Sequence, residues 1–99
     1  MRLTTAQVQA IRAAAAEAFG DGAAVWLFGS RVDDTKRGGD IDLLVQPASG
    51  AQDQLFRRKV RLLARLERAL GERKIDVVVE EPDDARPIVA IARQTGVRL

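Results

Sequence analysis

The chain contains no cysteine and no histidine among its 99 residues. Without cysteine it can form neither a disulfide nor a zinc–thiolate site. Without histidine it cannot use any catalytic triad, general base or metal site that depends on an imidazole. Its chemistry must therefore come from carboxylates, hydroxyls, amines, guanidinium groups and the backbone.

Long apolar runs are also missing. No run approaches the roughly 20 apolar residues that span a bilayer. The N-terminal segment Met1–Thr5 lacks the apolar core of a signal peptide. These absences predict a cytoplasmic protein with no part in a membrane.

The composition is that of a folded domain, with 46% hydrophobic and 30% charged residues. A chain of 99 residues predicts a single domain over 1–99 with one modest core. The net charge is only +2, but basic residues crowd the stretch 57–74, where the acidic residues are Glu67 and Glu72. Such a stretch is a phosphate-facing patch, an interaction surface or a solvated face, and the sequence leaves these open.

The spacing of apolar residues predicts helices at about 6–19 and 53–70, and a third that begins near Asp83 or Asp84. Period-two apolar runs predict strands at about 23–29, 40–46 and 74–80. The predicted class is α/β (α+β) in the order α-β-β-α-β-α. We expect a small mixed sheet of three or four strands, with helices packed on one face and the other face open.

Three aspartates interrupt the apolar strands. Asp40 and Asp42 lie two residues apart, so they project from the same side of a strand with Cα atoms about 7 Å apart. Asp76 lies in the next apolar run, and the turn Gly29-Ser30 precedes the pair. Carboxylates suit hard divalent cations, and a glycine turn offers backbone N–H groups to phosphate. Metal and phosphate together are typical of nucleotidyl or phosphoryl transfer.

These residues carry a family resemblance. The segment GSRVDDTKRGGDIDLLV resembles the signature of the minimal nucleotidyltransferases of the DNA polymerase β superfamily. In that family a Gly-Ser turn precedes an Asp-x-Asp strand, and a third aspartate lies on a later strand. The resemblance covers most of the chain, through the tail RPIVAIARQTGVRL. It departs at Gly38-Gly39, where many relatives have a serine before the first aspartate.

The resemblance implies a polymerase-β-like nucleotidyltransferase fold and an enzyme that uses ATP with Mg²⁺, as two ions. It assigns both catalysis and metal binding to the three carboxylates, Asp40, Asp42 and Asp76. It assigns nucleotide binding to the turn residues, Gly29, Ser30 and Arg31.

The resemblance also implies a partner. Small proteins of this kind transfer AMP from ATP to a tyrosine of a HEPN-type ribonuclease toxin and so act as antitoxins. Two alternatives stay open: an antitoxin that acts by binding alone, and a nucleotidyltransferase that acts as a homo-oligomer on a small molecule such as an aminoglycoside. A nucleic-acid substrate is not expected, because the chain has no second domain to grip a template.

The apolar positions of the 53–70 and C-terminal helices outnumber what one modest core can cover. Exposed apolar patches usually mark interfaces. We therefore expect self-association or a partner chain at one of these helices, with the basic residues favouring an acidic partner surface.

Overall fold

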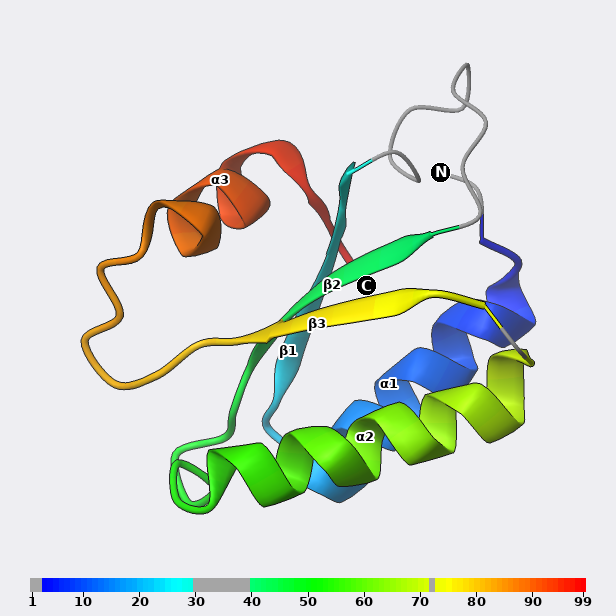
Figure 1. Cartoon of the computed structure of the whole chain (residues 1–99), viewed down its shortest axis with the longest axis horizontal. Coiled ribbons are helices and arrows are strands. Elements are labelled where there is room, and N and C mark those ends of the chain that lie inside the picture. The colour runs from blue at the N-terminus through cyan, green and yellow to red at the C-terminus, as the bar shows by residue number, and fades with distance from the viewer. Residues whose placement is uncertain (1–2, 30–39, 72) are drawn as a thin grey trace.

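The computed structural model describes residues 3–29, 40–71 and 73–99 (Figure 1). Its elements follow in the order α1 (Thr5–Phe19), β1 (Ala24–Phe28), β2 (Ile41–Gln46), α2 (Leu55–Leu70), β3 (Ile75–Val79), α3 (Pro87–Thr95) and β4 (Val97–Arg98). The predicted order is confirmed, and a two-residue strand follows it at the C-terminal end.

The strands form one four-stranded sheet in the order β3-β2-β1-β4. β1 is antiparallel to both β2 and β4, whereas β2 and β3 are parallel. The sheet is therefore mixed, and the α/β class predicted from the sequence is confirmed.

α1 and α2 lie side by side against one face of the sheet (Figure 1). The odd-numbered strand residues point into this layer, as the burial of Leu27, Leu43 and Val45 shows. α1 contributes Ile11 and Phe19. From α2 comes a helical stripe of fully or nearly buried leucines: Leu62, Leu66 and Leu70.

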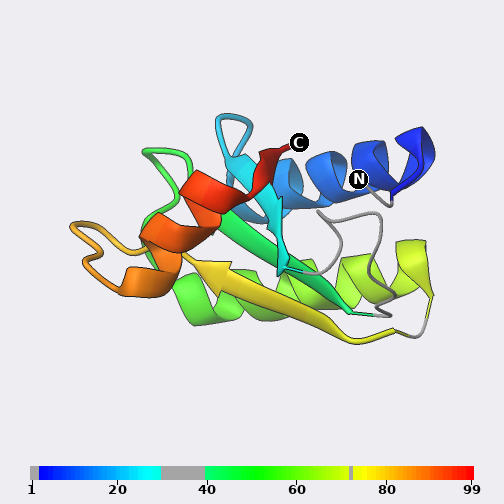
Figure 2. The same cartoon turned by 90° about the horizontal axis from the view of Figure 1, so that it is seen from above.

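α3 packs on the other face of the sheet, so the expectation that all helices share one face is wrong (Figure 2). Val89 and Ala92 of α3 form a second buried cluster with Leu44 of β2, and Trp26 and Phe28 of β1 pack against it. The physical reason lies in β2, where Leu44 points away from the main core and is fully buried. α3 thus covers one half of the face that we expected to be open.

The helix ends follow local capping chemistry. Thr4 caps α1, because its hydroxyl accepts from the N–H of Gln7 at 3.1 Å and its own N–H donates to the Gln7 side chain at 2.9 Å. α3 begins at Pro87, later than expected, because Asp84 caps a turn: its carboxylate accepts from the N–H of Glu81 at 3.0 Å. Proline suits this first helical position, since the N–H it lacks would be unpaired there.

Apolar side chains remain exposed on both outer helices, as expected. On α2 these are Phe56 (81% exposed) and Val60 (51%), and on α3 they are Ile88 and Ile91. Helical spacing groups Val60 with the apolar residues of α2, but its side chain lies outside the buried stripe. None of the helices in the described part of the chain has the length and apolar character needed to cross a membrane.

Candidate functional site

Strand pairing brings two of the predicted carboxylates together. Asp42 of β2 and Asp76 of β3 are register partners in the parallel ladder, and Phe28 of β1 is the partner of Asp42 on its other side. Neighbouring strands lie about 4.8 Å apart, and paired residues point to the same face. Phe28, Asp42 and Asp76 therefore form one row across the sheet, on the face that carries α3.

Phe28, at one end of this row, packs against the α3 cluster, whereas α3 leaves the two carboxylates uncovered. The next row on the same face is Trp26, Leu44 and Val78, and it packs in the cluster with α3. In the carboxylate row, Asp76 is exposed and Asp42 is half-buried. The two acids therefore open to solvent beside an apolar wall.

The carboxyl group of Asp42 is electrostatically crowded. Partial burial raises the pKa of Asp42, and the charges of Asp76 and Asp40 and a side-chain hydrogen bond with Asp76 raise it further. The positive charge of Lys74 acts in the opposite direction and lowers this pKa. The neighbouring charge of Asp76 therefore disfavours the ionised form of the Asp42 carboxyl group.

Gly29 follows β1 directly and touches Asp42. Its backbone has a φ of +79°, a conformation that favours glycine. A Cβ atom at this position would lie 3.2 Å from Cγ of Asp42 and would collide with one of its carboxylate oxygens. Only a residue without a side chain lets the turn approach the carboxylate this closely.

Asp40 lies just before β2 and is exposed. It is two residues from Asp42, and its charge contributes to the raised pKa of that group. Ser30 and Arg31, predicted to bind the nucleotide, lie outside the described residues.

The carboxylate pair fits a divalent cation on chemical grounds. Carboxylate oxygens are the donors that Mg²⁺ takes, and a bound cation would relieve the repulsion that raises the pKa of Asp42. Asp42 and Asp76 would hold such an ion, with Asp40 beside them. Within residues 3–29, 40–71 and 73–99, no three acidic side chains already gather closely enough to form a ready-made cation cage.

Lys74 belongs to this site although the sequence analysis assigned it no role there. It lies two residues before Asp76, hence on the same strand side. The N–H of Ile41 donates to its carbonyl at 3.0 Å, which places it beside the start of β2. The spacing Lys74-x-Asp76 is the sequence signal that would have placed a cation on the carboxylate face.

Comparison with known proteins agrees with this arrangement. The profile of the nucleotidyltransferase domain family matches residues 8–96, nearly the whole chain. No curated protein and no solved structure gives a significant match. The matched segment contains β1 with its glycine turn, the Asp-x-Asp strand β2 and the third aspartate on β3. The chain belongs to the nucleotidyltransferase domain family of the polymerase-β-like superfamily, whose members transfer nucleotidyl groups.

Proposed function

We propose that the protein transfers AMP from ATP, in the presence of Mg²⁺, to a hydroxyl group of a partner protein. The observation that supports this most is the crowded Asp42–Asp76 pair in contact with the Gly29 turn. Domains of this family generally use a nucleoside triphosphate and a divalent metal ion. The contact brings a glycine turn beside the carboxylates, and this supports phosphate binding next to a metal site.

In the reaction, the acceptor oxygen attacks the α-phosphorus of ATP and forms a new P–O bond. The bond between the α-phosphorus and the α–β bridging oxygen breaks, and pyrophosphate leaves with that oxygen. Asp76, which is exposed, takes the proton of the hydroxyl group. Asp42 and Asp76 would hold Mg²⁺, which would supply positive charge to the phosphate oxygens.

The residues at the turn after β1 bind the nucleotide. Gly29 brings its backbone close to the carboxylates. Ser30 donates its hydroxyl to a phosphate oxygen, and Arg31 supplies a guanidinium charge for the triphosphate. Lys74 adds a second positive charge on the same face.

The acceptor is a tyrosine of a HEPN-type ribonuclease toxin, so the protein acts as an antitoxin. The support is the resemblance of the GSRVDDTKRGGDIDLLV segment to minimal nucleotidyltransferases, together with the exposed apolar side chains of α2 and α3. A purely binding antitoxin would not require the Asp42–Asp76 pair, whose crowding raises the pKa of Asp42.

The test uses ATP labelled at the α-phosphate, Mg²⁺ and the full chain, with and without the product of the adjacent gene. We expect label on the partner chain, and a loss of roughly 10³-fold or more in Asp42→Asn. Asp83→Asn is the matched control: Asp83 is an exposed acid with a φ of +55°, where asparagine is tolerated. Equal labelling by Asp42→Asn and the wild type would exclude the carboxylate assignment.

A further inference from the structure

β3 forms a free edge of the sheet, because β2 is its sole strand partner in the described part of the chain. The carbonyl of Lys74 accepts from Ile41 at 3.0 Å, and the N–H of Glu80 donates to Val45 at 2.9 Å, so both residues direct their backbone toward β2. Backbone direction alternates along a strand. The outward groups therefore belong to the intervening residues: Ile75, Val77 and Val79.

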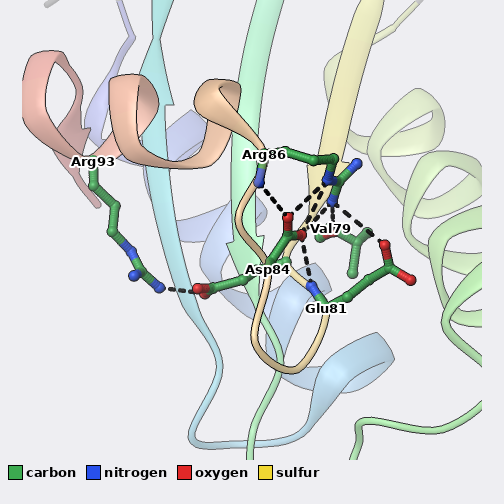
Figure 3. Close-up of polar contacts among 6 residues, drawn as sticks. Val79, Glu81, Asp84, Arg86 and Arg93 are labelled. Atoms are coloured by element: carbon green, nitrogen blue, oxygen red, sulfur yellow. Dashed lines mark hydrogen bonds and ion pairs between the residues drawn. The ribbon is translucent and has the colours of Figure 1, made fainter.

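One end of this edge is closed by a side chain (Figure 3). The guanidinium group of Arg86 donates to the carbonyl of Val79 at 2.7 Å and is itself held by Asp84 at 2.6 Å. For Ile75 and Val77, residues 3–29, 40–71 and 73–99 supply no outward partner. The open stretch therefore offers the backbone donors and acceptors of two alternate residues to a further strand.

Beside the edge, α2 offers an apolar surface. A hollow of about 360 Å³ lies between Phe56 and Val77, and another of about 280 Å³ lies between Leu63 and Ile75. The exposed side chains of Phe56 and Val60 follow the same side of the helix. We call this combination of the β3 edge and the Phe56–Leu63 stripe the edge groove.

Basic side chains outnumber acidic ones at the edge groove: Lys59, Arg73 and Arg86 line its two hollows, together with Glu67 and Glu81. Along α2, Arg58 pairs with Asp53 at 3.0 Å, and Arg65 pairs with Glu17. Lys59 makes no ion pair with any described residue, and neither do three other cations of the helix: Arg57, Arg61 and Arg68. The complementary occupant is acidic.

The charge at the edge groove favours some binding partners over others. A second copy of the chain would set two helices with the same unmatched cations against each other. Nucleic acid would match the charge, but it would not use the free backbone edge or the apolar stripe. Both of these suit a polypeptide strand. The occupant that satisfies edge, stripe and charge is an extended acidic polypeptide.

The position of the edge groove relative to the carboxylates adds a chemical constraint. A strand added to β3 lies about 4.8 Å away, and its residue opposite Asp76 points to the same face as Asp76. The residues on either side of it point to the opposite face, toward α2. An added strand would therefore carry one side chain beside the catalytic carboxylate while its neighbours contact the apolar stripe.

We propose that the acceptor is an extended segment of an acidic partner protein that adds as a strand to β3, with its hydroxyl-bearing residue opposite Asp76. Apolar and acidic residues alternate with that residue and contact the stripe and the cations of α2. This inference rests on the proposed function and names the class of acceptor for it.

The probe is the peptide Glu-Thr-Val-Tyr-Val-Thr-Glu with blocked ends, whose glutamates and valines fall on one side of a strand and whose tyrosine falls on the other. Nuclear magnetic resonance without nucleotide follows the amide signals of the protein. We expect the amides of Ile75 and Val77 to shift on binding. Replacing both glutamates by lysine should weaken binding by roughly tenfold or more.

Two matched variants locate the contact. Val60→Ser and Ile91→Ser remove apolar side chains that are 51% and 50% exposed, one in the edge groove and one on α3. Val60→Ser should weaken peptide binding several-fold, and Ile91→Ser should leave it unchanged. The reverse order would overturn the proposal, as would equal binding of the lysine peptide.

The remaining outcomes separate the alternatives. No shift at Ile75 and Val77, peptide-independent dimerisation through these amides, or their displacement by a single-stranded oligonucleotide would each overturn the proposal. A second titration, with ATP and Mg²⁺ alone, follows the amide of Gly29. If the peptide shifts Ile75 and Val77 but ATP with Mg²⁺ does not shift Gly29, the proposed function is refuted and strand docking stands. If ATP with Mg²⁺ shifts Gly29 but the peptide shifts neither Ile75 nor Val77, strand docking alone is refuted.

Discussion

Replacing Gly29 with alanine tests the contact on which the site depends. The residue has a φ of +79°, and an added Cβ would lie 3.2 Å from Cγ of Asp42 and collide with its carboxylate. The left-handed backbone alone costs alanine about 1–2 kcal/mol. In a domain of this size that corresponds to a fall of roughly 4–16 °C in Tm.

Gly71 provides a control for the loss of a positive-φ glycine away from the site. It has a φ of +81° and a ψ of −173°, a region that only glycine readily adopts, and a Cβ there would meet open space. Gly71→Ala therefore reports a backbone cost alone, whereas Gly29→Ala adds the collision. Because pairing with Phe28 and Asp76 holds the backbone of Asp42, its side chain must rotate away from Gly29 and leave its present position in the site.

The assay is thermal unfolding by circular dichroism together with transfer from labelled ATP. We expect Gly71→Ala to lower Tm and leave the rate per folded molecule unchanged. Gly29→Ala should also lower Tm and should cut the rate by roughly 10²-fold, the scale of a misplaced catalytic group. Similar rates in the two variants would refute the idea that this close approach organises the site.

Three further predictions concern stability. Asp42→Asn should raise Tm while it abolishes transfer, because a raised pKa means that the folded protein disfavours the ionised carboxylate; a lower Tm would count against this. Hydrogen bonds from Arg86 lower the pKa of Asp84, so their stabilisation is present above the ordinary aspartate pKa of about 4 and is lost as pH falls below it. Urea unfolding of Arg86→Gln should accordingly show a weaker loss of stability in acid than the wild type, and an unchanged acid profile would contradict the assignment. Gly96→Ala would put a Cβ 2.7 Å from the carbonyl of Leu27, and it should cost about 1–3 kcal/mol, measured as a lower Tm; an unchanged Tm would show that this turn yields freely.

The carboxylate row follows from sequence because the period of a strand is two. Asp42 sits between Ile41 and Leu43, and Asp76 between Ile75 and Val77, so each acid must leave the core when its neighbours enter it. The same rule puts Lys74 on that face. Local pattern thus determines the face of each residue once the strands exist.

The sequence analysis did not predict that a helix packs on that face of the sheet, although the sequence contains a signal for it. Leu43, Leu44 and Val45 are consecutive apolar residues, and such a run is typical of a strand buried on both sides. α3 buries Leu44 from the far side. Its own sequence did not reveal this, because apolar residues lie on both its buried side, at Val89, and its exposed side, at Ile91.

The contact between Gly29 and Asp42 was beyond local reasoning for another reason. It depends on the antiparallel register of β1 and β2, in which Phe28 faces Asp42. The pairing of all the strands in the sheet determines that register, and the two residues in contact do not. Spacing along the chain indicates that such residues meet, and strand pairing decides which atoms touch.

The two edges of the sheet are unequal, and this asymmetry limits where a strand can add. β4 is two residues long, so the edge it forms offers little to a further strand. At the other edge, Arg86 occupies the carbonyl of Val79 and leaves a short opening. Strand addition to this sheet would therefore take place beside β3, and copies of the chain could not propagate a fibre through both edges.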